Sequence, residues 1–160
     1  MTEIQLSPTE IKVACMVGTL RRQTSKESGM RDRAGRPNDW TADIEGAAGE
    51  IALAKYLGIY YEPTNKTFEL PDVGIVEVKT STRAMEIPIP PTIPDDRIVC
   101  GVFGLIPDFR IGGWIMGVDA KKFSLVVKTH GYPPAHWIPI EELAPAVELQ
   151  EMVQTSRKEP

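Results

Sequence analysis

This sequence has little of several features that mark common protein classes. It contains two cysteines, Cys15 and Cys100, which are too few for a disulfide framework and form no paired metal motif. No apolar run approaches the roughly 20 residues of a membrane span. The two histidines, His130 and His136, have no Cys or carboxylate pattern around them, and no G-x-x-x-x-G-K-[ST] loop is present. A disulfide scaffold, a membrane span, a zinc site and a nucleotide cofactor are therefore not expected.

The N-terminal segment, MTEIQLSPTEIK, also lacks the basic-then-apolar layout of a signal peptide. With cysteines that we expect to be reduced, this predicts a cytoplasmic protein. A length of 160 residues with 42% apolar and 25% charged residues is typical of one globular domain. Within residues 1–160 we expect an N-terminal helix and basic loop over 1–39, a core over 40–147 and a frayed tail over 148–160.

The distribution of charge is more informative than its sum. The net charge is −4 and the pI is near 5.3, which does not by itself indicate a nucleic-acid binder. Residues 12–36, however, contain seven basic residues and only two acidic ones. Such a run either contacts phosphates or is simply a solvated face. Under the first interpretation the contacts come from Arg21, Arg22, Lys26, Arg31, Arg33 and Arg36.

Local patterns predict two helices before the first clear strand. Ser7-Pro8-Thr9-Glu10 is a capping box that starts a helix running to about Arg22. A second helix is expected from Asp39 or Thr41 to Gly58, with small apolar residues on one arc that let it lie close to a sheet.

The later part of the chain reads mainly as strands. Strand patterns cover residues 75–80, 97–105, 109–118 and 135–140. Residues 86–96 contain four prolines, which predicts an extended, polyproline-like connection. Short helices are expected near residues 118–122 and 141–143. These elements predict an α/β or α+β fold.

The segment LPDVGIVEVK, residues 70–79, contains the candidate catalytic residues. Glu77 and Lys79 are two residues apart on a strand, so both side chains project from one face. Asp72 lies five residues before Glu77, which would put it on the opposite face of a continuous strand. A turn or bulge at Val73-Gly74 can reset the parity and bring the two carboxylates together.

Two converging carboxylates repel each other unless a cation lies between them. Hard oxygen ligands of this kind suit Mg²⁺, so we expect an ion held by Asp72, Glu77 and the backbone carbonyl of Val78. Such an ion polarises a phosphodiester and lowers the pKa of a bound water. Lys79 is then placed to orient the water or neutralise developing charge. Mn²⁺ is expected to substitute for Mg²⁺.

These residues resemble the PD-(D/E)xK motif of the restriction-endonuclease-like nuclease superfamily, and small phage or prophage members in particular. Pro71-Asp72 followed by Glu77-Val78-Lys79 is similar to the motif, and GAAGEIA at residues 46–52 is similar to the first core helix. The resemblance implies an αβββαβ core, a mixed central sheet flanked by helices, over roughly residues 40–140. It also implies Mg²⁺-dependent hydrolysis of DNA, or less often RNA, leaving a 5′-phosphate.

The helix of that family commonly supplies one more acidic residue. Glu50 and Glu45 compete for this position, and the Gly-Glu-Ile-Ala context favours Glu50. After the motif, the strand continues into further polar residues that either contact phosphate or only end the strand. These are Thr80, Ser81 and Arg83.

Two functions of different classes are compatible with these residues. The first is a metal-dependent deoxyribonuclease of a phage or mobile element, acting in the host-cell cytoplasm. The second is a protein of the same fold that has lost catalysis and serves as a DNA-binding or assembly subunit. The partner in both cases is DNA, and a homodimer would let such a small protein address two strands.

Overall fold

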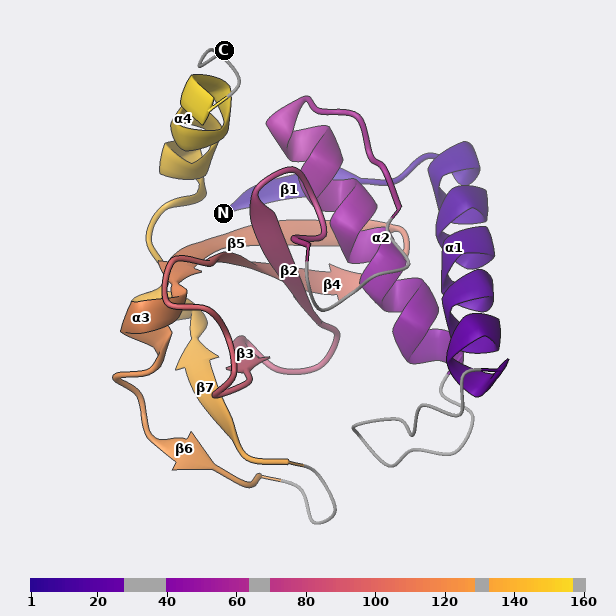
Figure 1. The fold of residues 1–160 in the computed structure, drawn as a ribbon. Helices are drawn as coiled ribbons and strands as arrows, with labels where there is room; N and C mark the ends of the chain where they lie inside the picture. The colour runs from indigo at the N-terminus through magenta and orange to yellow at the C-terminus, as the bar shows by residue number, and fades with distance from the viewer. Residues whose placement is uncertain (28–39, 64–69, 129–132, 157–160) are drawn as a thin grey trace.

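The structure is a computed structural model that describes residues 1–27, 40–63, 70–128 and 133–156. It has an α+β fold in which helices flank mixed and antiparallel sheets (Figure 1), as the sequence predicted. None of the helices in these residues is both long and apolar enough to cross a membrane. The elements in chain order are β1 (Thr2–Gln5), α1 (Pro8–Glu27), α2 (Trp40–Leu57), β2 (Val76–Ser81), β3 (Glu86–Ile89), β4 (Ile98–Leu105), β5 (Asp108–Met116), α3 (Gly117–Ala120), β6 (Leu125–Val126), β7 (Ala135–Pro139), the 3₁₀ turn η1 (Ile140–Glu142) and α4 (Ala146–Ser156).

The main sheet has four strands in the order β1-β5-β4-β2. β2 pairs with β4 in parallel, with Val78 opposite Cys100, whereas the other pairs are antiparallel. β2 is therefore an edge strand, and its second edge is free of the sheet. Four strands rather than three follow α2, and the next helix, α3, is a single turn, so the element order differs in detail from the expected αβββαβ series.

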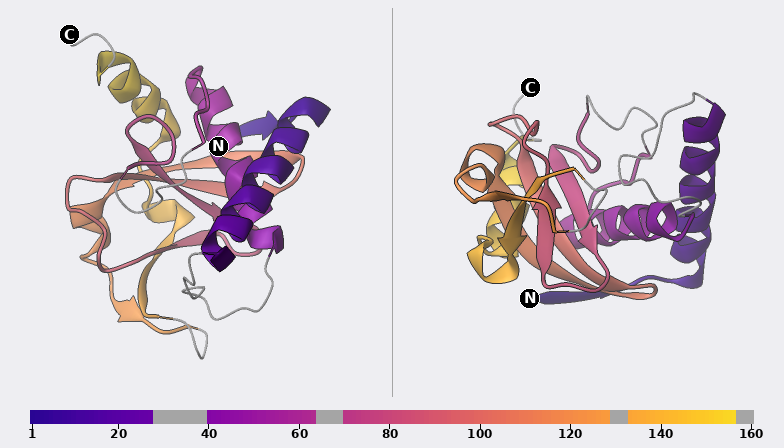
Figure 2. Two further views of the ribbon diagram at one scale, coloured as in Figure 1. Left: turned by 45° about the vertical axis from the view of Figure 1, so that its right-hand side comes forward. Right: turned by 90° about the horizontal axis from the view of Figure 1, so that it is seen from below.

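Helix α2 packs on one face of this sheet, and α1 packs against α2 (Figures 1 and 2). The capping box at the start of α1 is formed, because Ser7 N donates to Glu10 Oε2 at 2.6 Å and Glu10 N donates to Ser7 Oγ at 3.3 Å. α1 continues to Glu27, beyond the predicted end near Arg22. α2 lies close to β2 because Gly49 has no side chain: a Cβ there would be 2.0 Å from Thr80 Oγ1.

The other face of the main sheet is covered by a second sheet with the order β3-β7-β6. Buried side chains between them include Ile87, Val99 and Ile138. The prediction that residues 86–96 are only an extended connection is wrong for their first part, which forms β3. Pro88 is tolerated there because β3 is an edge strand that pairs on one side only.

The C-terminal region also differs from the prediction. Residues 148–156 do not fray but belong to α4, which packs against β5 and α2. Leu149 and Val153, four residues apart on one helix face, are almost completely buried. This narrow apolar stripe fixes a helix whose other positions are mainly polar. Residues 157–160 lie outside the described residues.

Candidate active site

A tight hairpin places Asp72 beside β2. Val73 and Val76 exchange two backbone hydrogen bonds of 3.0 and 2.9 Å, so Gly74 and Ile75 form a two-residue turn. Gly74 has a φ of +59°, a conformation that glycine adopts without strain. The structure thus has a turn between Asp72 and Glu77, one residue later than the predicted Val73-Gly74. The chain before the turn runs back along the free edge of β2 and brings Asp72 level with Val78.

Asp72 takes the place of a neighbouring strand at this edge. Its Oδ2 accepts a hydrogen bond of 2.8 Å from the backbone N–H of Val78. In a β-strand the N–H and C=O of one residue point to the same edge, so the Val78 carbonyl also faces Asp72. The sequence-based expectation that this carbonyl belongs to the site therefore agrees with the strand geometry.

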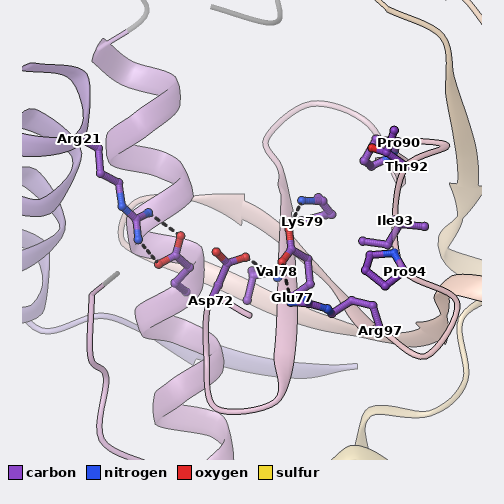
Figure 3. A pocket seen from close by; sticks show the side chains of 11 residues that line it. Arg21, Asp72, Glu77, Val78, Lys79, Pro90, Thr92, Ile93, Pro94 and Arg97 are labelled. Atoms are coloured by element: carbon purple, nitrogen blue, oxygen red, sulfur yellow. Dashed lines mark hydrogen bonds and ion pairs between the residues drawn. The ribbon is translucent and has the colours of Figure 1, made fainter. Parts of the chain in front are cut away.

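The expected acidic side chains meet around the edge of β2 from both faces of the sheet. Glu77 and Lys79 lie on the face of the second sheet, whereas Glu50 comes from α2 on the opposite face. Asp72 lies at the edge between them (Figure 3). Together with Val78, these residues line one cleft of about 280 Å³.

Glu50, rather than its competitor Glu45, lines this cleft. It is 5% exposed and both of its oxygens are hydrogen-bonded by Arg21 of α1, at 2.6 and 2.9 Å. Tyr61 Oη also donates to Glu50 Oε2 at 2.8 Å. Glu45 accepts a hydrogen bond from the backbone of Ile106, and burial raises its pKa. Helix α2 thus presents the carboxylate of Glu50 to the cleft, and Arg21 forms a two-point ion pair with it.

Glu77 is paired with two cations on the other side. Lys79 Nζ donates to Glu77 Oε1 at 2.6 Å, and the Arg97 guanidinium lies 3.7 Å from Glu77 Oε2. The opposite wall of the cleft comes from the proline-rich segment between β3 and β4, including Pro90 and Pro94 (Figure 3). Proline restricts the backbone of this wall, which makes it a stiff boundary for a ligand.

The pKa of Asp72 is strongly shifted by its place between two other carboxylates. Burial raises the pKa of Asp72, and repulsion from Glu50 and Glu77 raises it further, to about 7, against the opposing effects of the Val78 N–H and Lys79. Burial alone lowers the pKa of the Arg21 guanidinium, but its pairing with Glu50 raises it above its usual value. Burial and the two neighbouring carboxylates thus disfavour the ionised form of Asp72, and a cation bound at Asp72 would favour it.

The oxygen donors of the cleft are of the type that a divalent metal prefers. Carboxylate oxygens and a backbone carbonyl suit a hard cation such as Mg²⁺. Among residues 1–27, 40–63, 70–128 and 133–156, however, no three Asp, Glu, His or Cys side chains are grouped to hold one ion as they stand. Arg21 and Lys79 act as the counter-ions in this arrangement. The oxygen donors are of a type that fits Mg²⁺. To bind the ion, Glu50 would have to release Arg21 and Glu77 would have to release Lys79.

The residues predicted to contact a nucleic-acid backbone are dispersed. Arg22 is 7% exposed and forms a 2.6 Å ion pair with Asp43 of α2, so the prediction that it contacts phosphate is wrong: its guanidinium is used between two helices. Arg21 reaches the cleft through Glu50 instead of projecting from a basic surface. The side chain of Lys26 and the whole of Arg31, Arg33 and Arg36 lie outside what the structure describes.

The polar residues after the motif line a neighbouring groove rather than the cleft itself. Thr80 packs against Gly49 of α2 and its hydroxyl is buried. Ser81 Oγ donates to the carbonyl of Ala84 at 2.7 Å, and Arg83 is exposed. This groove also reaches Lys79.

Sequence patterns missed two residues that contact the acidic side chains of the cleft. Arg97 reaches Glu77 because it immediately precedes β4, which starts level with Val76 in the parallel pair. Tyr61 reaches Glu50 from the extended segment after α2. Neither position stands in a recognisable motif, and the parallel pairing that brings Arg97 to the site leaves no local signal.

Comparisons of this chain with protein-family models, curated proteins and solved structures found no match.

Proposed function

We propose that this protein is a Mg²⁺-dependent nuclease that hydrolyses phosphodiester bonds of DNA in the cleft at the edge of β2. The observation that carries the proposal is the meeting of Asp72, Glu77 and Glu50 with Lys79 in one cleft, although they come from a turn, a strand and a helix. A salt bridge between Glu77 and Lys79 alone would be common on any surface strand. A hairpin that folds Asp72 back onto the same strand is not needed for such a pair.

Asp72, Glu77 and the Val78 carbonyl would hold the cation, with Glu50 supporting it. When bound, Mg²⁺ supplies a Lewis acid that polarises the phosphodiester and lowers the pKa of a water molecule. Lys79 orients the attacking water and neutralises charge on the phosphate oxygens as the new P–O bond forms and the ester P–O bond breaks. Arg97, on the far side of Glu77, binds an adjacent phosphate oxygen.

One observation favours a second candidate, a DNA-binding protein of the same type that does not catalyse. Glu50 and Glu77 already have internal counter-ions, Arg21 and Lys79, which is the arrangement expected of a site that uses no metal. The raised pKa of Asp72 supports the first candidate, because a site that had lost its metal would gain by losing this buried carboxyl.

The test compares cleavage by the wild type with cleavage by Lys79→Ala. Supercoiled, linear and branched DNA are incubated with Mg²⁺, Mn²⁺ or Ca²⁺, and DNA binding is measured in Ca²⁺. We expect cleavage in Mg²⁺ or Mn²⁺ and a loss of roughly 10²–10³-fold in the variant, with binding largely retained. Lys122→Ala, at an exposed lysine paired with Asp119, is the matched control and should cleave like the wild type.

Equal cleavage by the wild type and Lys79→Ala would contradict the role of Lys79. DNA binding without cleavage in any metal would exclude the enzyme and support the second candidate.

A further inference from the structure

A second cavity joins the cleft at Lys79. This groove has a volume of about 600 Å³ and shares Glu50, Val78 and Lys79 with the cleft. It runs between the first turns of α2 and the end of β2, and continues to Trp137 of β7. The groove therefore adjoins the cleft at these residues and extends towards the second sheet.

Gly46 lines this groove without any structural need for a glycine. It lies inside α2, where glycine is less favourable than alanine. A Cβ at Gly46 would meet no atom within 4 Å, whereas one at Gly49 would collide with Thr80. Packing explains the glycine at 49 but not the one at 46. Without a side chain at Gly46, the groove is wider at this point and the backbone of α2 is accessible from it.

The groove offers one exposed cation and an aromatic ring to a ligand. Arg83 is exposed at the groove and has no ion pair among the residues that the structure describes. Trp137 lines the far end, where its indole N–H donates to the Val126 carbonyl at 3.3 Å. Lys128 Nζ lies 4.7 Å from the centroid of the Trp137 ring, so one face of the ring is in contact with a cation and a base would use the other. The two acidic residues of the groove are engaged, Glu50 with Arg21 and Glu45 with the backbone of Ile106.

We infer that the groove binds a single strand of nucleic acid as it leaves the cleft, with Arg83 on a phosphate and Trp137 against a base. This rests on the proposed function and narrows its substrate to DNA with a single-stranded segment. A cation and an aromatic platform along a narrow groove are the recurring elements of single-strand binding. A volume of this size holds a few nucleotides of one strand, as pockets of roughly 300–1,000 Å³ hold small ligands.

The test measures binding in EDTA, so that cleavage plays no part. Fluorescence anisotropy is recorded with a short oligodeoxyuridylate, an oligouridylate of equal length and a blunt DNA duplex. We expect the wild type to bind a single strand at least about tenfold more tightly than the duplex. The comparison of the two single strands decides whether the groove prefers the deoxyribose or the ribose backbone.

Two substitutions at one position report on the groove itself. Gly46→Ala should keep the affinity for the single strand, and Gly46→Gln, which fills the groove, should weaken it by about tenfold or more. Both variants should unfold at the wild-type temperature or above, because Ala and Gln are better helix formers than Gly. A melting curve therefore separates a blocked groove from a misfolded protein.

Arg83→Ala tests the phosphate contact, with the exposed Arg110 of β5 as the matched control. We expect the slope of log affinity against log salt to fall by about 0.7 for Arg83→Ala and to stay unchanged for Arg110→Ala. Unchanged binding by Gly46→Gln, or a wild type that binds duplex as tightly as single strand or binds neither, would overturn the groove. Binding of a single strand in the groove without Mg²⁺-dependent cleavage would instead contradict the proposed nuclease activity and leave the inferred groove standing.

Discussion

Two neighbouring arginines on α1 hold α2 in different ways. Arg22 pairs with Asp43 in the first turn of α2, and Arg21 pairs with Glu50 two turns further along. Both shortest distances are 2.6 Å, but the side chain of Asp43 is 30% exposed and that of Glu50 only 7%. Asp43 is also favoured by its place at the positive end of the helix dipole.

The difference lies in the charges around each pair. Glu50 lines the cleft with Asp72 and raises the pKa of that carboxyl, whereas Asp43 does not line the cleft. The pair of Arg22 thus connects the two helices away from the cleft. The pair of Arg21 connects the same helices and also sets the charge of the candidate active site. Substitutions at the two pairs should therefore have different effects on activity, stability and metal binding.

The largest difference is expected in activity. Glu50→Gln keeps the size of the side chain but removes a negative charge from the cleft, so we expect single-turnover cleavage in Mg²⁺ to fall at least about 100-fold. Asp43→Asn makes the matched change in the other pair and should stay within about threefold of the wild type. Equal losses in both variants would show that Glu50 acts only by holding the helices together.

The next difference is in stability and its response to metal. Arg21→Met leaves the buried Glu50 without its counter-ion and should cost about 3–5 kcal/mol of unfolding free energy. Arg22→Met leaves Asp43, which water can reach, and should cost about 1 kcal/mol. Chemical denaturation in EDTA measures both values.

Millimolar Mg²⁺ sharpens this comparison. If the ion can take the place of the guanidinium, it should restore part of the stability of Arg21→Met and none of that of Arg22→Met. An identical response of the two variants to Mg²⁺ would argue against a cation site at Glu50.

Much of the candidate site could be predicted from sequence because its signals are local. The alternation of residues 76–79 puts Glu77 and Lys79 on one face, and the parity problem of Asp72 requires the turn that Gly74 makes. Both inferences need only the geometry of one strand and one turn. The choice of Glu50 rather than Glu45 followed from a motif resemblance, because both residues flank the apolar arc of α2 and helix geometry does not separate them.

The rest depends on contacts between residues far apart in the chain. The ion pair of Arg21 with Glu50 depends on how α1 crosses α2. The contact of Arg97 with Glu77 depends on the parallel pairing of β2 with β4. Periodicity in a single segment cannot specify either. For the same reason the sequence wrongly predicts Arg22 at a phosphate surface, since a run of basic residues does not reveal which of them turns inward.

The smallest expected effect concerns Asp72, whose pKa is raised by Glu50 of the Arg21 pair and not by Asp43 of the Arg22 pair. Its pKa of about 7 in the folded protein lies above its usual value of 3.8. The stability that comes from a raised pKa is fully present below pH 4 and is lost as the pH rises through 7. Asp72→Asn, which stays neutral, should therefore gain on the wild type by on the order of 2 kcal/mol between pH 5 and pH 8 in EDTA.

Denaturation curves at the two pH values measure this gain. The exposed Asp119 provides the control, since Asp119→Asn should differ from the wild type by the same amount at both pH values. An Asp72→Asn difference that does not change with pH would mean that neither burial nor the charges of Glu50 and Glu77 raise the pKa of Asp72. Mg²⁺ should reduce the gain by stabilising the ionised wild type, most strongly at pH 8, because protons compete with the ion for the same carboxylate.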